Sequence, residues 1–302
     1  PALIRTSKNS SPGWKTYLLK DFGSKEFSNC VYCNFEESPE LKKLFGGNLE
    51  PERIIRDLEL LLRVKVRPGR TLLIMDEIQE CGEAMTSLKY FNEHMPDLHI
   101  ACAGSLLGII KAKASFPVGK VDTKYLYPMN FFEYLIAEGE ETVAEFIMSD
   151  PDEISEPVHE TILRLLRDYC IVGGMPAVVN SWITDHDIVE VDRIQKELLN
   201  NYSRDFAKHG GDMVESLTSV WHAIPSFLSR ENRRVVFKEL KKGAKSEDFS
   251  NPVQWLENAH MVYRAKMVKR HAYPPSTEED EGMYKLYMCD VGLLRAMAGH
   301  PA

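Results

Sequence analysis

One short apolar run that ends in two acidic residues constrains this chain more than any other feature. Residues 72–75 are Leu-Leu-Ile-Met, and Asp76 and Glu77 follow directly. A continuous apolar run of this length is typical of a strand buried on both faces, as in a parallel sheet. The acidic pair would lie at the carboxyl end of that strand, where open α/β sheets bind their ligands. This pattern is typical of a Walker B strand, in which Asp supports Mg²⁺ and Glu polarises a water. An ordinary charged strand end that reaches solvent is an equally weighted alternative.

Short apolar runs alternate with helical patterns through the first half of the chain. Strands are predicted at residues 2–4, 30–35, 71–75 and 99–103. Helices are predicted between them, at residues 15–22 with Gly23 as the C-cap, at 49–62 and at 84–92. Alternation of this kind predicts a mostly parallel, three-layer α/β domain.

From about residue 130 the pattern changes to helices. The longer ones are predicted at residues 131–148, 156–171, 187–209 and 220–228. Shorter helices at 235–242 and 251–259 precede strands at 261–265 and 284–290, an order typical of a winged helix. We therefore predict a core at 1–130, a helical region at 131–213, a winged-helix-like domain at 214–272 and the start of a truncated C-terminal module at 273–302.

Composition narrows the class of protein. With 302 residues, 44% of them hydrophobic, the chain is long enough for about two domains with cores of their own. It has no apolar stretch long enough to span a bilayer and no secretory signal. Cys30 and Cys33 would face opposite ways on a strand, which favours buried free thiols over a metal site. We expect a cytoplasmic protein without a membrane partner.

Charge is distributed unevenly along the chain. The net charge is −8, which argues against a nucleic-acid binder as a whole, yet residues 220–272 hold 11 Lys and Arg against 5 Asp and Glu. The candidate DNA contacts in this segment are Arg230, Arg233, Arg234, Lys238, Lys241 and Lys242. A solvated basic face, or a surface that binds a protein, is the alternative interpretation.

A Walker B strand implies a phosphate-binding loop before the first helix. The motif G-x-x-x-x-G-K-[ST] uses glycines to bring backbone N–H groups to the phosphates, Lys to neutralise charge and Ser or Thr to bind Mg²⁺. Gly13, Lys15 and Thr16 stand at the expected place, but Trp14 puts an indole where the backbone must approach phosphate. Either the glycine pattern has been lost, or the sequence is irregular at residues 6–14.

A third strand end adds a polar residue. Ser105 follows the strand predicted at 99–103. ATPases with a Walker B strand keep a polar residue at this place, where it contacts the γ-phosphate or the attacking water. Serine after a strand is common, so it carries weight only jointly with the other two strand ends. Together the three strand ends favour a site for ATP and Mg²⁺.

Several segments resemble one known family in sequence and in order. They are YCNFEE (32–37), LIMDEIQE (73–80), AGSLLG (103–108), SFPVGKV (115–121), LYPMNFFEYL (126–135) and GGMP (173–176). The chain resembles the prokaryotic AAA-type P-loop ATPases that carry a C-terminal domain of unknown function. The resemblance implies a P-loop NTPase core, a helical region, a winged helix and then a nuclease-like module. It also implies ATP binding, with Asp76 and Glu77 as the Walker B pair.

Two functions follow as hypotheses. The first is an ATPase that couples its nucleotide state to the helical and winged-helix regions; the second is a hydrolysis-deficient P-loop protein that acts as a DNA- or protein-binding regulator. Trp14 favours the second hypothesis, and the acidic pair favours the first. An oligomer is compatible with either. In the first hypothesis, the catalytic residues are Asp76, Glu77 and Ser105. The nucleotide-binding residues are Gly13, Lys15 and Thr16, and Mg²⁺ is held by Thr16 and Asp76.

Overall fold

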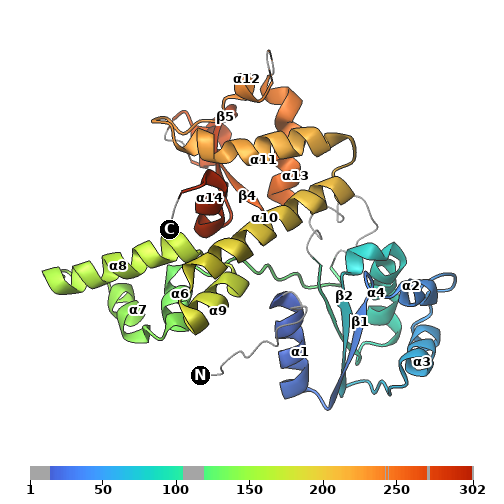
Figure 1. Cartoon of the computed structure of the whole chain (residues 1–302). Helices are drawn as coiled ribbons and strands as arrows, with labels where there is room; N and C mark the ends of the chain where they lie inside the picture. Colours follow the sequence, from blue (N-terminus) through green and yellow to red (C-terminus); the bar gives the residue numbers. More distant parts are fainter. Residues whose placement is uncertain (1–13, 105–118, 242, 244, 271–272, 301–302) are drawn as a thin grey trace. The chain divides into compact units, whose positions relative to one another are not determined.

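A computed structural model describes residues 14–104, 119–241, 243, 245–270 and 273–300. The chain divides into two compact units, residues 1–126 and 127–302 (Figure 1). The strand predicted at residues 2–4 lies outside the described residues. Within the described ranges, no helix combines the length and apolar character that crossing a bilayer requires.

Three parallel strands form the sheet of the first unit, in the order β1–β2–β3 (Figure 1). In register, Asn34 on β1 pairs with Asp76 on β2, and Met75 pairs with Cys102 on β3. The predicted parallel α/β sheet is confirmed for these strands. Their bounds are β1 (Asn29–Asn34), β2 (Thr71–Asp76) and β3 (His99–Cys102).

Side chains of β1 and β2 alternate between two helical layers. Val31, Cys33, Leu73 and Met75 belong to a hydrophobic core with residues of α3 and α4. Their neighbours along the strands face α1 on the opposite side of the sheet, which gives this unit three layers (Figure 1). The helices are α1 (Trp14–Glu26), α2 (Pro39–Leu44), α3 (Pro51–Leu62) and α4 (Gly82–His94), with the 3₁₀ turn η1 (Ile78–Glu80) before α4.

The prediction that Gly23 ends the first helix is wrong. Helix α1 continues to Glu26, and Gly23 lies where the helix crosses the sheet. A Cβ at this position would come within 2.8 Å of the Sγ of Cys30 and 3.2 Å of the side chain of Leu72. The glycine therefore permits close approach of the helix to the sheet and has no capping role.

Helices build most of the second unit. The predicted helix at 131–148 is in fact two, because Gly139 adopts φ 86° and closes the first of them. Buried Tyr134, Val172, Val178 and Val191 lie in the core of this helical part. Its helices are α6 (Phe131–Glu138), α7 (Glu141–Met148), α8 (Glu156–Val172), α9 (Pro176–Asp185) and α10 (Ile188–His209).

Shorter elements follow α10 in the same unit. They are η2 (Gly211–Met213), α11 (Val214–Leu228), α12 (Phe237–Leu240), η3 (Ser246–Phe249), α13 (Ser250–Asn258), β4 (Val262–Val268), η4 (Pro275–Glu278), β5 (Glu279–Met288) and α14 (Val291–Ala298). The helix predicted at 235–242 is shorter, because Val236 and Lys241 are extended at either end of α12. Val235 donates its N–H to the carbonyl oxygen of Tyr284 on β5 instead.

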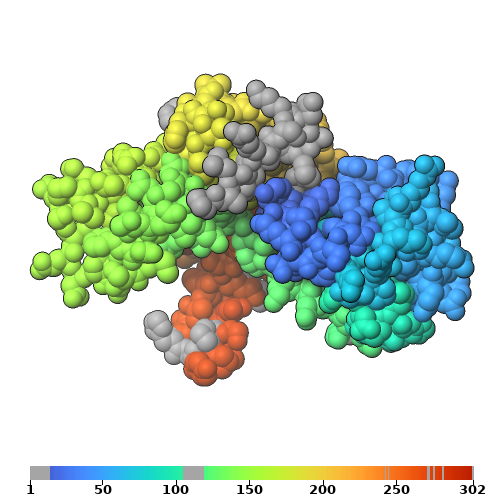
Figure 2. Space-filling model, turned by 90° about the horizontal axis from the view of Figure 1, so that it is seen from below, coloured from blue at the N-terminus to red at the C-terminus, as the bar shows by residue number. Residues whose placement is uncertain are grey.

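An antiparallel ribbon of β4 and β5 projects from this unit, in orange in Figure 2. Ion pairs cross it, from Lys266 to Glu279 at 2.9 Å and from Lys269 to Asp280 at 3.0 Å. Residues beyond 272, predicted to begin a further module, thus contribute β5 to this ribbon. The boundaries at 130, 213 and 272 remain predictions.

A glycine turn joins three distant segments of the second unit. Met129 donates its N–H to the oxygen of Gly174 over 2.7 Å, and Gly174 donates its own N–H to the carboxylate of Asp290 over 2.6 Å. A Cβ on Gly174 would come within 1.9 Å of the oxygen of Met129, so only glycine fits. Asp290 also accepts the N–H of Leu293 as the N-cap of α14.

Candidate functional site

Asp76 lies at the carboxyl end of β2, with only 3% of its surface exposed. Its Oδ2 accepts hydrogen bonds from the Thr16 hydroxyl at 2.5 Å and from the Tyr32 hydroxyl at 2.8 Å. Its Oδ1 accepts the backbone N–H of Glu77 at 3.0 Å. Three donors thus satisfy a buried carboxylate that has no cationic partner among these bonds.

The first turn of α1 brings two predicted site residues to this strand end. Thr16 is buried and reaches Asp76, whereas the ammonium of Lys15 donates to the carbonyl oxygen of Gly104 at 3.1 Å. Gly104 lies two residues beyond the end of β3, so this bond joins the start of α1 to the segment that follows β3. Backbone N–H groups in the first turn of a helix lack intrahelical partners and favour anions.

Glu77 is held in an uncommon backbone conformation. Its φ of 49° and ψ of 43° lie in the left-handed region, which is unfavourable for a residue with a side chain. The amide of Gln79 donates to its carboxylate. Burial, and to a smaller extent the charges of Asp76 and Glu36, raise the pKa of Glu77, while Gln79 and Lys15 lower it. A carboxylate with a raised pKa is a better proton acceptor than an ordinary Glu.

The structure therefore brings four predicted residues together: Lys15, Thr16, Asp76 and Glu77. Two others, Gly13 and Ser105, lie outside the described residues.

Sequence reasoning missed three further side chains near Asp76. Tyr32 donates to Asp76, Asn34 donates its side-chain N–H to the Tyr32 hydroxyl at 3.3 Å, and the ammonium of Lys20 lies 3.5 Å from the centre of the Tyr32 ring. Burial, followed by the bond to Asp76, raises the pKa of Tyr32. The sequence does show two polar residues, Tyr32 and Asn34, in the second half of β1. They can be assigned to Asp76 only when the register of β1 against β2 is known.

The donor set fits Mg²⁺. A hydroxyl that donates its hydrogen, as Thr16 does to Asp76, keeps its oxygen lone pairs for a cation. Mg²⁺ prefers oxygen ligands and keeps several waters, so one hydroxyl, one carboxylate and nucleotide phosphates suffice. Among the described residues, no group of three or more His, Cys, Asp or Glu could form an all-protein metal site. All six cysteines are free thiols; Cys33 is buried, as predicted, whereas Cys30 is only half-buried and Cys170 is exposed.

The predicted DNA contacts are only partly available. Arg230 forms an ion pair with Glu239, and Arg234 donates to the sulfur of Met283 at 3.6 Å. The side chains of Arg233, Lys238 and Lys241 are exposed. Lys242 lies outside the described residues.

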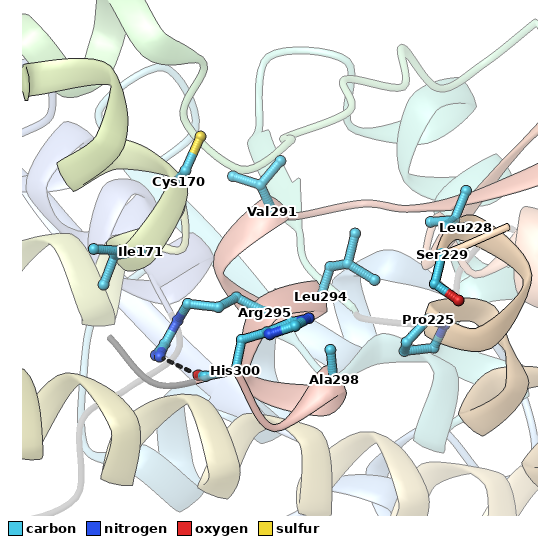
Figure 3. A pocket seen from close by; sticks show the side chains of 10 residues that line it. All are labelled: Cys170, Ile171, Pro225, Leu228, Ser229, Val291, Leu294, Arg295, Ala298 and His300. Carbon is cyan, nitrogen blue, oxygen red and sulfur yellow. Dashed lines mark hydrogen bonds between the residues drawn. The ribbon is translucent and has the colours of Figure 1, made fainter. Parts of the chain in front are cut away.

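A cavity of about 410 Å³ lies in the second unit among α8, α11 and α14 (Figure 3). Its walls are mainly apolar, with Leu228 and Leu294 among them. Arg295, the arginine among its described lining residues, donates to the oxygen of His300 at 3.0 Å and forms an ion pair with Asp192. The described lining residues include no carboxylate to bind Mg²⁺, and no lysine or second arginine to bind phosphate, so Asp76 and its neighbours remain the candidate site.

Two known protein families match parts of this chain. Residues 14–135 match the family described as "AAA domain", and residues 163–302 match "Domain of unknown function (DUF8612)". No curated protein and no solved structure matches it. The first match includes Lys15, Thr16, Asp76 and Glu77. The match and the geometry of these residues together support an AAA-type, nucleotide-binding P-loop domain at residues 14–135.

Proposed function

We propose that the first unit binds ATP with Mg²⁺ and hydrolyses it, and that its nucleotide state acts on the second unit. One observation carries the proposal: the Thr16 hydroxyl is bonded directly to the Asp76 carboxylate, and Glu77 is the next residue. A hydroxyl at the start of a helix, paired with a buried carboxylate at the end of a parallel strand, suits a nucleotide-bound Mg²⁺.

Each residue has a distinct role in this proposal. Thr16 and Asp76 hold Mg²⁺, which when bound neutralises the charge that develops on the phosphate oxygens. Lys15 contributes a positive charge towards the same phosphates. Glu77 accepts the proton of the attacking water, a role for which its raised pKa is suited.

Trp14 keeps the second hypothesis open. It is the first residue of α1 and directly precedes Lys15. A protein that binds ATP without turning it over would use the same Lys15, Thr16 and Asp76, but would not depend on Glu77. The two hypotheses therefore differ in the role of a single carboxylate.

The test compares wild type with Glu77→Gln in ATP binding and in phosphate release. Glu83→Gln is the matched control, because it makes the same chemical change on the exposed first turn of α4. We expect both variants and wild type to bind ATP with Mg²⁺. Loss of the general base should lower release by Glu77→Gln about 10²- to 10⁴-fold, with no change in Glu83→Gln.

Three results separate the possibilities. Wild type that does not bind ATP contradicts the proposal. Binding without release in wild type and in Glu77→Gln alike supports the hydrolysis-deficient alternative. Equal release by wild type and Glu77→Gln removes Glu77 from the mechanism.

We also propose that α11, α12, α13 and the β4–β5 ribbon form a winged-helix-like module that binds DNA. The order of these elements supports this, as does the bond from Val235 to Tyr284, which adds an extended segment beside the ribbon. Exposed Lys238 and Lys241 supply charge for phosphate contacts. The ion pairs across the ribbon weigh against phosphate contacts by Lys266 and Lys269.

A further inference from the structure

A directed chain of hydrogen bonds leads from the turn after β1 to Asp76. The side-chain oxygen of Asn34 accepts the backbone N–H of Glu36 at 2.9 Å and that of Glu37 at 3.3 Å. These bonds fix the orientation of the Asn34 amide, because only its oxygen can accept them. The nitrogen of the amide therefore faces the hydroxyl oxygen of Tyr32, at 3.3 Å.

The direction of the last bond follows from the one before it. Because Asn34 donates to the Tyr32 oxygen, the hydroxyl hydrogen of Tyr32 is left to point at Oδ2 of Asp76, 2.8 Å away. The ring itself is held by its place on β1 and by the ammonium of Lys20, 3.5 Å from the ring centre. The hydroxyl is thus a fixed donor on an ordered strand.

We infer that Tyr32 is a positioning residue for Asp76, holding that carboxylate in the orientation that accepts Mg²⁺ with ATP. This inference rests on the proposed function. Thr16 approaches the same Oδ2 from α1, so the carboxylate is held between a helix and a strand. A metal ligand held by hydrogen bonds from its surroundings binds more tightly, because less of its motion is lost on binding.

The Tyr32 hydroxyl donates its hydrogen to Asp76 and accepts a hydrogen bond from Asn34. Its role in this arrangement is to hold the carboxylate as a hydrogen-bond donor. Loss of this hydroxyl should therefore change the Mg²⁺ concentration that the protein requires. The affinity for the nucleotide in the absence of Mg²⁺ should not change.

The test is Tyr32→Phe, which removes one hydroxyl and keeps the ring. Tyr90→Phe on α4 is the matched control, because Tyr90 lies outside this chain of hydrogen bonds. Binding of a fluorescent ATP analogue is measured in EDTA and then across a Mg²⁺ titration. We expect the Mg²⁺ concentration for half-maximal effect to rise about tenfold in Tyr32→Phe, with affinity in EDTA unchanged. Tyr90→Phe should match wild type.

A second variant guards against misfolding, which thermal melting in EDTA would reveal. Asn34→Ala keeps Tyr32 but frees its hydroxyl to rotate, so we expect a smaller shift in the same direction. If the variants that fold respond to Mg²⁺ at the wild-type concentration, the inference fails while the proposed function stands. An equal loss of affinity with and without Mg²⁺ also overturns it, because that is the result of a purely structural role. If wild-type affinity for the analogue does not depend on Mg²⁺, the proposed function fails, and the role of Tyr32 fails with it.

Discussion

Replacing Asp290 with Ala should lower the free energy of unfolding of the second unit by no more than about 2–4 kcal/mol. The substitution removes the N-cap bond to Leu293, worth about 1 kcal/mol. It also leaves the N–H of Gly174 buried without an acceptor, which costs about 1–3 kcal/mol. Burial removes water from the Asp290 carboxylate, which disfavours its charged form and raises its pKa. Removing this desolvated carboxylate therefore offsets part of the loss in stability.

Asp187→Ala is the matched control. Asp187 caps α10 through the N–H of Val189 at 2.9 Å, and this bond is exposed. It should therefore show the cost of a lost cap alone, about 1 kcal/mol. The difference between the two variants isolates the bond to Gly174.

Tryptophan fluorescence during urea unfolding can follow this unit selectively. Trp182, Trp221 and Trp255 lie in the second unit, and a Trp14→Phe background removes the one tryptophan of the first. Both Ala variants are made in that background. Their free energies of unfolding are compared with that of the background protein, provided that the dependence of this free energy on urea concentration has the same slope in all three. If Asp290→Ala is no more destabilised than Asp187→Ala, the junction at Gly174 contributes nothing and the reasoning is refuted.

Two further predictions concern proton binding and charge. Turnover should fall as pH drops through the raised pKa of Glu77, because the carboxylate must be ionised to accept a proton, and Gln79→Ala should move this acid limb to higher pH because Gln79 lowers that pKa. A kcat–pH profile measures both, and a limb that stays in place or moves down contradicts the assigned roles. If the second unit binds DNA, Lys238→Ala combined with Lys241→Ala should weaken binding and flatten the dependence of log Kd on log salt by about two phosphate contacts. Lys196→Ala on α10 is the control, and an unchanged salt slope in the double variant would remove this patch from the interface.

Local sequence patterns were sufficient for the three described strands of the first unit and for the acidic pair, whereas β5 begins at Glu279, five residues before the strand predicted at 284–290. Residues 72–75 are apolar without interruption, which predicted a strand buried on both faces, and β2 is buried throughout. Asp76 and Glu77 then had to fall at its carboxyl end. The division between α6 and α7 was missed because apolar residues recur on both sides of the acidic stretch around Gly139, and a single glycine in a helical pattern is an ambiguous signal.

Contacts between distant segments could not be predicted. Tyr32 reaches Asp76 only because β1 and β2 pair in one particular register. Asp290 accepts the N–H of Gly174 although 116 residues separate them in the sequence, and neither the GGMP segment nor Asp290 indicates this contact by itself. The local pattern predicts a helix end at Gly23 and cannot show its contact with Cys30, a residue of the neighbouring strand.

The alternation of side chains along β1 and β2 separates two kinds of mutational sensitivity within the same few residues. Odd-numbered positions such as 31, 33, 73 and 75 lie in the hydrophobic core, whereas Tyr32 and Asp76 are even-numbered and meet on the other face. Adjacent substitutions should therefore have unlike consequences. A change at an odd position reduces the amount of folded protein in a cell, while a change at Tyr32 or Asp76 leaves folded protein whose chemistry is altered. Abundance and activity, measured together, should separate in this way from Val31 to Cys33 on β1 and between Met75 and Asp76 on β2, whereas changes at the buried apolar Leu72 and Ile74 should lower abundance.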